Sequence, residues 1–352
     1  MQALRWHGRG QLRLDEVDEP QASGPGRAVV EISYCGLCGT DLHEYLHGPN
    51  MIRLDAHPLT GACPPMILGH EMSGIVSALG GDSRGIDLGM RVALDPILRC
   101  GHCRWCRRGD YHLCEKGGSI GLAAPGGFAR FVEVPLENLV PVPDAVSDQM
   151  AALAEPLAVG LHAAKRGLVG PGDNVLVLGS GPIGIAALLG ARMAGAAAVF
   201  VSEPLAPRAE QAYGFGATEV FDPALVDVRR EVFGRTARIG PDVVIDATGR
   251  AELVELAIRT TRRGGRVVMA GISDTQLSVD LRQIVLFERS IFGSLGYNHD
   301  IPRVLDLMAT GRLDASALVT GIRSLADAPT VFAELEADRG RHLKVLINPK
   351  DQ

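Results

Sequence analysis

Hydrophobic and polar positions divide the chain into two kinds of segment. Over residues 153–296, continuous apolar runs such as NVLVLG (174–179) and AVFVSE (198–203) alternate with helical patterns such as IGIAALLGARMAG (183–195). Apolar strands that alternate with helices are typical of a parallel sheet covered on both faces. This segment is therefore predicted to be a doubly wound α/β domain.

Residues 1–152 show shorter β-like runs instead, among them RAVVEIS (27–33) and MSGIVSAL (72–79), with glycine and proline between them. Such punctuation predicts a β-rich domain with functional loops. The segment 297–352 carries a helical pattern and a last strand, HLKVLIN, and we assign it to the same domain. The expected organisation is a β-rich domain of residues 1–152 and 297–352 and an α/β domain of residues 153–296.

The composition fits a two-domain α/β protein. The 352 residues are 46% hydrophobic and 22% charged, which is ordinary for a globular chain of this length. The N-terminal segment MQALRWHGRGQLRLDEV lacks the apolar stretch of a signal peptide, and no apolar run of about 18 residues occurs. We therefore expect a soluble, cytoplasmic protein without a membrane partner. The net charge of −6 argues against nucleic acid as a partner.

A glycine triplet of the form G-x-G-x-x-G follows the first apolar run of the α/β domain and opens a helix. Glycines allow the backbone to approach a pyrophosphate, and the helix N-terminus stabilises its charge. Glu203 ends the next strand, where a carboxylate accepts hydrogen bonds from the adenosine ribose and repels a 2′-phosphate. The pattern predicts a NAD site. Its loop consists of Gly179, Gly181, Pro182, Ile183 and Gly184.

Four of the seven cysteines lie close together in the sequence: Cys100, Cys103, Cys106 and Cys114. In a reducing cytosol such cysteines are metal ligands rather than disulfides. Four thiolates suit a closed tetrahedral zinc site without an open position for substrate, so we predict a structural zinc. Two alternatives stay open, namely that His102 or His112 replaces one cysteine and that the metal centre is an iron–sulfur cluster.

A second set of metal-ligand residues is spread over three motifs. CGLCGTDLHEY contains Cys38, Thr40, Asp41 and His43, ILGHE contains His70 and Glu71, and AEPLAVG contains Glu155. One cysteine, one histidine and one carboxylate leave a fourth zinc position for water or an alcohol, which is typical of a catalytic zinc. The sequence thus predicts two zinc ions per chain, one structural and one catalytic.

Taken in order, CGLCGTDLH, GHE, the four-cysteine segment and GSGPIG resemble the zinc-dependent medium-chain alcohol dehydrogenases, over about residues 3–348. DLHEYLHGPN and EPLAVGLHAAKR resemble the 2,3-butanediol dehydrogenase branch, near sorbitol and threonine dehydrogenases. The resemblance implies a GroES-like catalytic domain, a Rossmann cofactor domain, and a homodimer or homotetramer joined through the sheet edge SIFGSL. It leaves Glu71 and Glu155 as competing third ligands of the catalytic zinc.

The resemblance also implies roles for individual residues. Thr40 would contact the substrate oxygen, and His43 would pass the proton to solvent. Arg208 would lie near the adenosine, and Lys344 would reach the pyrophosphate. Together these roles imply hydride transfer between NAD and a small secondary alcohol or vicinal diol, such as 2,3-butanediol, with a ketone such as acetoin as the other partner.

Two further functions stay open at this point. A pathway-specific dehydrogenase of the same family would act on a polyol, an amino alcohol or a larger secondary alcohol. A protein of another class would bind NAD and zinc without catalysis, or would reduce quinones without zinc. The intact metal-ligand, Thr40 and His43 positions favour the zinc enzyme.

Overall fold

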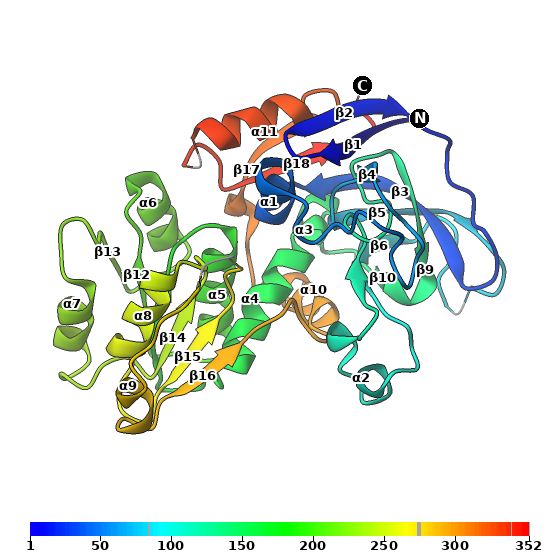
Figure 1. Cartoon of the computed structure of the whole chain (residues 1–352). Helices are drawn as coiled ribbons and strands as arrows, with labels where there is room; N and C mark the ends of the chain where they lie inside the picture. Colours follow the sequence, from blue (N-terminus) through cyan, green and yellow to red (C-terminus); the bar gives the residue numbers. More distant parts are fainter. Residues whose placement is uncertain (84, 273–275, 339, 352) are drawn as a thin grey trace. The chain divides into compact units, whose positions relative to one another are not determined.

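The computed structural model describes residues 1–83, 85–272, 276–338 and 340–351 (Figure 1). The chain forms two compact units: unit 1 is Met1–Glu155 with Ile301–Gln352, and unit 2 is Pro156–Asp300. Both divisions fall a few residues later than the sequence pattern suggests. The first lies inside a helix, α4 (Ala154–Arg166), whose opening turn belongs to unit 1.

Unit 2 is built on one parallel sheet of six strands in the order β13-β12-β11-β14-β15-β16. The inner strand β11 is fully buried from Val175 to Leu178, which explains its continuous apolar run. The strands are β11 (Asn174–Leu178), β12 (Ala198–Ser202), β13 (Glu219–Phe221), β14 (Val243–Asp246), β15 (Arg266–Met269) and β16 (Ser290–Gly293). The doubly wound prediction is confirmed.

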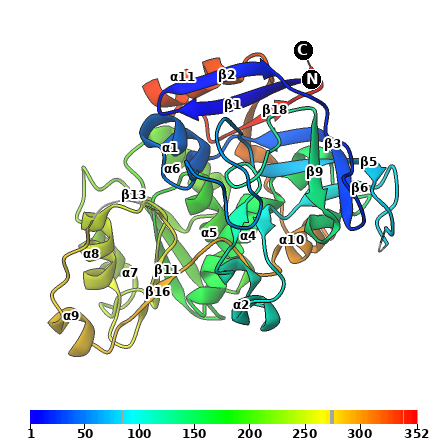
Figure 2. The ribbon, with the colours of Figure 1, turned by 45° about the vertical axis from the view of Figure 1, so that its right-hand side comes forward.

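The helices of unit 2 lie on both faces of this sheet in the two views of the ribbon (Figures 1 and 2). They are α4, α5 (Pro182–Met193), α6 (Ala206–Gly214), α7 (Val228–Arg235), α8 (Ala251–Thr260) and α9 (Arg282–Val285). The winding reverses at β11, which lies between β12 and β14. Ligands of such sheets bind outside the carboxyl ends of the strands at this point. The helices in the described ranges are too short or too polar to span a bilayer.

Unit 1 is β-rich. Its main sheet has the order β10-β6-β5-β3-β18-β17, with β9 paired to β3, and a smaller sheet has the order β2-β1-β4. The strands are β1 (Gln2–Gly8), β2 (Gln11–Glu16), β3 (Arg27–Gly36), β4 (Met66–Ile67), β5 (Glu71–Leu79), β6 (Arg91–Leu94), β7 (Ile97–Leu98), β8 (Gly118–Ser119), β9 (Phe131–Pro135), β10 (Leu139–Pro141), β17 (Val319–Ser324) and β18 (Lys344–Asn348).

Short helices connect these strands: α1 (Gly39–His47), α2 (Arg104–Arg107), α3 (Asp148–Ala152), α10 (Ile301–Ala309) and α11 (Ala328–Ala337), with 3₁₀ helices at Tyr111–Leu113, Leu136–Asn138 and Ser316–Leu318. The C-terminal strand β18 pairs antiparallel with β3, so the C-terminal segment completes the main sheet of unit 1.

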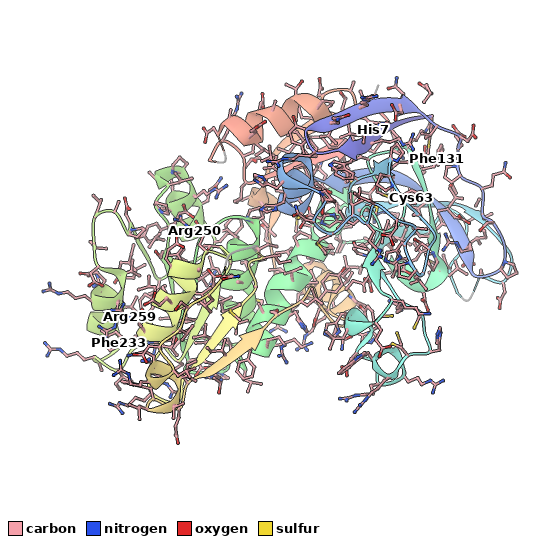
Figure 3. All side chains as sticks on the ribbon, in the orientation of Figure 1. His7, Cys63, Phe131, Phe233, Arg250 and Arg259 are labelled. Carbon is pink, nitrogen blue, oxygen red and sulfur yellow. The ribbon has the colours of Figure 1, made fainter. Side chains whose placement is uncertain are left out.

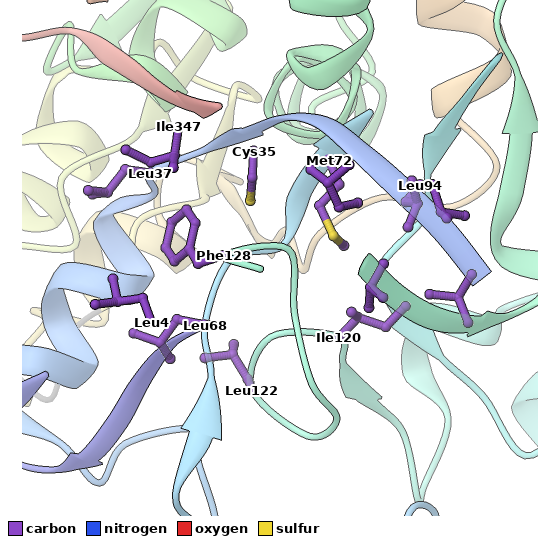
Figure 4. Close-up of a cluster of buried hydrophobic side chains, with 14 of the residues drawn as sticks. Leu4, Cys35, Leu37, Leu68, Met72, Leu94, Ile120, Leu122, Phe128 and Ile347 are labelled. Atoms are coloured by element: carbon purple, nitrogen blue, oxygen red, sulfur yellow. The ribbon is translucent and has the colours of Figure 1, made fainter. Parts of the chain in front are cut away.

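The core of unit 1 fixes the loop that precedes β5. The buried Cys35 belongs to one hydrophobic cluster with Leu37, Leu68, Phe128 and Ile347, all labelled in Figure 4. Gly69 lies against this cluster with a φ of +92°, and a Cβ there would stand 2.6 Å from the Cys35 sulfur. Only glycine fits this conformation and this approach. The core therefore holds the backbone immediately before His70, the first chemically interesting residue of the loop.

Candidate functional site

Three side chains of unit 1 converge on one point. Cys38, His70 and Glu71 each offer a ligand atom, and these atoms lie within 4.8 Å of one another. The register of the main sheet explains the meeting, because Gly36 at the end of β3 pairs with Glu71 at the start of β5. The two motifs are distant in sequence, and the β3–β5 pairing brings them together.

Cys38 is the N-cap residue of α1. The Cys38 backbone N–H donates to Asp41 Oδ2 at 3.0 Å, and the Cys38 thiol donates to the Thr40 hydroxyl at 3.7 Å. The start of α1 thus presents the sulfur and the hydroxyl side by side.

Asp41 orients His70, a role that the sequence did not reveal. Its carboxylate is fully buried, accepts the Gly69 N–H at 3.3 Å and stands 3.4 Å from His70 Nδ1. A carboxylate on one imidazole nitrogen leaves Nε2 for a metal. Burial opposes a positive charge on His70, but Asp41 and Cys38 outweigh burial and raise the pKa of His70 well above its usual range.

Glu71 forms a buried ion pair with Lys344 of β18. Lys344 Nζ lies 2.6 Å from both Glu71 oxygens and 3.1 Å from the Leu37 carbonyl, and both side chains are at most 2% exposed. Burial lowers the pKa of Lys344, but Glu71 and Cys38 more than compensate and raise it. In this structure the Lys344 ammonium therefore neutralises Glu71.

Glu155 lies outside the compact set of Cys38, His70 and Glu71. Burial raises the pKa of Glu155 to about 8; the charge of Glu71 adds to this effect and that of His70 opposes it. The thiol, imidazole and carboxylate of the compact set fit zinc, which takes three protein ligands of these types at catalytic sites. Cys38 and His70 belong to both possible sets of zinc ligands, and the third ligand is either Glu71 or Glu155. Glu71 is paired with Lys344.

Cys100, Cys103, Cys106 and Cys114 form the second cluster, with all four sulfurs within 4.8 Å of one another. The Cys103–Cys106, Cys100–Cys106 and Cys103–Cys114 sulfur distances are 3.5, 4.0 and 4.0 Å. A tetrahedral zinc with bonds of about 2.3 Å separates its sulfurs by about 3.8 Å, so the cluster has the size of a four-thiolate zinc site. His102 and His112 lie outside this four-residue set.

Backbone N–H groups prepare these thiols for metal. The Cys100 N–H points to the Cys114 sulfur and the Cys103 N–H to the Cys100 sulfur, both at 3.3 Å. Hydrogen bonds from the backbone at Cys106 and Glu115 lower the pKa of Cys103 to about 6. The other cysteines differ, because Cys35 is buried in the core and Cys63 lies at the surface (Figure 3).

The glycine loop of unit 2 follows β11 and leads into α5. Gly181 is the N-cap of α5, and Pro182 occupies its first turn, with Ile183 next to it. Gly179 has a φ of +85°, and a Cβ on Gly184 would overlap the Gly179 carbonyl oxygen. The outer two glycines of the triplet are thus required by the turn itself, and the helix N-terminus is left open to an anion.

Glu203 is tied to this loop. Glu203 Oε2 accepts hydrogen bonds from the N–H and the hydroxyl of Ser180 at 2.8 and 3.0 Å, and Oε1 accepts one from the Leu205 N–H at 3.0 Å. Arg208 lies on the same side, because a Cβ on Gly181 would stand 3.7 Å from Arg208 Nη1. The structure brings Glu203, Arg208 and the glycine loop together at the carboxyl ends of β11 and β12.

Thr40 and His43 lie three residues apart on α1, which places them on one side of the helix. His43 is held by the following loop, since Asn50 Nδ2 stands 3.2 Å from the His43 carbonyl and 3.4 Å from its Nδ1. Asn50 is itself fixed by the fully buried Glu44, whose oxygens accept its backbone N–H at 3.0 and 3.2 Å. No sequence pattern points to Glu44 or Asn50.

Comparisons with known proteins identify the family of the chain. The family "Alcohol dehydrogenase GroES-like domain" matches residues 24–144, and the family "Zinc-binding dehydrogenase" matches residues 182–310. The chain is 36% identical to (R,R)-butanediol dehydrogenase of Bacillus subtilis, over 99% of this chain and 100% of that protein. It is 31% identical to D-xylulose reductase A of Aspergillus oryzae, over 97% and 94% of the two chains.

Solved structures give the same picture. The crystal structure of 2R,3R-butanediol dehydrogenase from Bacillus subtilis has a TM-score of 0.92 and 35% identity and covers 99% of both chains. A zinc-binding dehydrogenase from Sinorhizobium meliloti 1021, solved bound to NADP, has a TM-score of 0.89 and 33% identity and also covers 99% of both chains.

Proposed function

Because this chain belongs to the zinc-dependent medium-chain alcohol dehydrogenases, we propose that it oxidises a vicinal diol of the 2,3-butanediol type with NAD and catalyses the reverse reduction. It is an oxidoreductase acting on secondary alcohols or diols. The observation that carries the proposal is the cluster of Cys38, His70 and Glu71, a set with room for one further ligand. The likeness to (R,R)-butanediol dehydrogenase supports the choice of diol.

The chain would hold the catalytic zinc through Cys38 and His70, with Glu71 or Glu155 as the third ligand. When bound, zinc supplies a Lewis acid for the substrate oxygen and NAD supplies a hydride acceptor. Asp41 keeps the imidazole of His70 turned so that one nitrogen faces the metal. Cys100, Cys103, Cys106 and Cys114 would hold the structural zinc, which leaves the four-cysteine segment without a place in the reaction.

Thr40 and His43 would carry the proton away from the substrate hydroxyl. The Thr40 hydroxyl stands beside the Cys38 sulfur, where a bound alcohol would lie, and His43 is half-buried one helical turn further along α1. The change His43→Gln should slow oxidation most at low pH, because solvent base is then scarce. A pH profile of kcat identical to that of the unaltered enzyme would remove His43 from the path.

A polyol dehydrogenase is the second candidate, because D-xylulose reductase A is also a relative. Formation of NADH should be compared for the 2,3-butanediol stereoisomers, xylitol, sorbitol, threonine and larger secondary alcohols, and the reverse reaction for acetoin. We expect the largest kcat/KM for a butanediol stereoisomer. A larger kcat/KM for xylitol would make the protein a polyol dehydrogenase, and no turnover of any alcohol would leave only a zinc and NAD binding protein.

The Glu203 position supports NAD over NADP. Its carboxylate stands at the glycine loop, where a 2′-phosphate would meet like charge. Such repulsion costs a few kcal/mol, and each 1.4 kcal/mol is about tenfold in affinity, so we expect a preference of roughly two orders of magnitude. Arg208 opposes this, and the Sinorhizobium meliloti neighbour was solved with NADP. Comparable kcat/KM values for the two cofactors would reject the assignment.

A homodimer or homotetramer formed through the edge of the unit 2 sheet is also part of the proposal. Strand β16 ends the sheet, and the segment before it exposes Leu281, Val285 and Leu286 by 65–70%. An open edge strand favours pairing with a second copy, and exposed apolar side chains such as those around α9 favour burial against one. Light scattering should show a dimer or tetramer that the change Leu286→Glu weakens, whereas a monomer at micromolar concentration would contradict the proposed oligomer.

The cysteines support a cytoplasmic setting for the protein. All seven are free of disulfides, and disulfides are rare in the reducing cytosol.

A further inference from the structure

Three arginines of unit 2 gather at the end of the sheet opposite to the glycine loop. Arg263 lies just before β15 and Arg289 directly before β16, so both belong to the amino ends of the parallel strands. Arg229 of α7 lies beside the C-terminal end of α8, which leads to Arg263, because its Nε donates to the Arg259 carbonyl at 3.2 Å. Gly179 follows the carboxyl end of β11, at the other edge.

Two aromatic rings hold these guanidinium groups in place. The guanidinium carbons of Arg263 and Arg289 lie 4.5 and 4.4 Å from the centroid of the same ring, Phe287. The Arg229 guanidinium lies 4.8 Å from the Phe233 ring. Figure 3 labels Phe233 and Arg259 next to each other at this end of unit 2. Stacked guanidinium groups are pre-ordered, so they lose little freedom when they bind a ligand.

Arg289 is a buried cation without an acidic partner. It is 7% exposed, and it donates to the backbone oxygen and side-chain oxygen of Gln283 at 3.2 and 3.1 Å. In the part of the chain that the structure describes, no carboxylate oxygen lies within 4.0 Å of the nitrogens of Arg229, Arg263 or Arg289, the adjacent Glu288 included. Burial and the charges of Arg229 and Arg263 lower the pKa of Arg289.

The neighbouring arginines Arg262 and Arg259 do have carboxylate partners, which sets them apart from the three arginines of the cluster. Arg262 Nε lies 2.6 Å from Asp242, and Arg259 Nη1 lies 3.6 Å from Glu255. A buried charge is costly unless it is paired and hydrogen-bonded. Two positive charges beside one buried guanidinium make three in all, and they point to a ligand that brings at least two negative charges.

We propose that Arg229, Arg263 and Arg289 form a binding site for a phosphate group, taken up as inorganic phosphate or as a phosphate monoester. Phosphate carries a charge of about −1.5 to −2 near neutral pH and offers three acceptor oxygens. Arginine recognises these oxygens through paired N–H donors, and one carboxylate would neutralise only one of the three cations. The site is separate from the cofactor loop and does not depend on the proposed function.

The test is a titration of the full-length protein with inorganic phosphate, at constant ionic strength balanced with chloride and with NADH at saturation. On the proposed function NADH would occupy the glycine loop at the N-terminus of α5 and so keep phosphate from that site. Calorimetry should give saturable binding with a Kd of about 1 mM or tighter, and the unfolding temperature should rise with the phosphate concentration. A second arm with glycerol 3-phosphate distinguishes a monoester from the free ion.

Two double variants with equal loss of charge decide the location. R229Q/R263Q changes exposed side chains of the site and should weaken phosphate binding at least tenfold. R303Q/R312Q removes two exposed arginines of unit 1 and should leave it unchanged. R289K keeps the charge but loses the planar fork, so it should weaken binding in part. Equal weakening in the two double variants, no change in R229Q/R263Q, or absence of saturable binding would each overturn the site.

Discussion

The buried pair of Lys344 and Glu71 gives a sharp prediction for the change Lys344→Met. The change removes the cation and leaves a fully buried carboxylate that has lost hydrogen bonds of 2.6 Å to both of its oxygens. Breaking a buried ion pair from one side costs about 3–5 kcal/mol, because the remaining charge is uncompensated. We expect a loss of that size in the free energy of unfolding of the zinc-free protein.

Zinc should reduce this loss. If Glu71 is the third ligand, the metal takes over part of the compensation, and Lys344→Met should cost less in the zinc-loaded protein than in the zinc-free protein. If Glu155 is the ligand, the cost should be similar in both. The double change Lys344→Met with Glu71→Leu should recover much of the stability, because well-packed apolar residues can replace a buried pair.

The assay is urea unfolding followed by tryptophan fluorescence. The two tryptophans, Trp6 and Trp105, both lie in unit 1, so the signal reports on the unit that contains the pair. Lys350→Met is the matched control, since Lys350 pairs with Glu31 at 3.3 Å near the surface, where such pairs contribute about 0–1 kcal/mol. A zinc-free Lys344→Met protein within about 1 kcal/mol of the unaltered protein would refute the reasoning.

Three further predictions concern other parts of the chain. Cys103→Ser should reduce the zinc content from two ions to one and lower the unfolding temperature, which metal analysis and calorimetry check; turnover per remaining zinc should persist. Gly184→Ala puts a Cβ into the Gly179 carbonyl oxygen and should cost about 1–3 kcal/mol and weaken NADH binding, measured by fluorescence titration. Asp300, 1% exposed, is paired with Lys165 at 2.7 Å; burial raises its pKa, but hydrogen bonds from His162 and Lys165 lower it overall. The contribution of Asp300 to the free energy of unfolding is therefore present above the ordinary carboxyl pKa and is lost as the pH falls. The change Asp300→Asn should cost about 1.5–3 kcal/mol of that free energy at pH 7 and progressively less below about pH 4. Urea unfolding at several pH values measures this cost.

The sequence predicts unit 2 well because its signals are local. A continuous apolar strand such as β11, a glycine turn and a helix follow one another directly along the chain, and each residue interacts with near neighbours. The four-cysteine segment is predicted for the same reason. Its ligands are close in sequence, and the residue type alone decides the chemistry.

The set in unit 1 could be listed from the sequence but not assembled from it. Cys38 and His70 are brought together only by the pairing of β3 with β5, and the hydrophobic periodicity of the sequence does not specify the register of that pairing. The sequence pattern assigns no positioning role to Asp41 or Glu44, and these roles appear only with burial, since both side chains are fully buried and hold backbone or imidazole groups. Long-range register and burial are tertiary properties.

The role of Lys344, which the family resemblance implies, also depends on tertiary structure that the sequence does not reveal. From its place in HLKVLIN, Lys344 reads as a strand lysine that could extend toward a phosphate. In the structure β18 lies beside β3, and this pairing turns the ammonium to Glu71 and the Leu37 carbonyl, which together use its three donors. The pairing with Glu71 therefore accounts for the burial of Lys344, and its contact with a pyrophosphate stays a prediction.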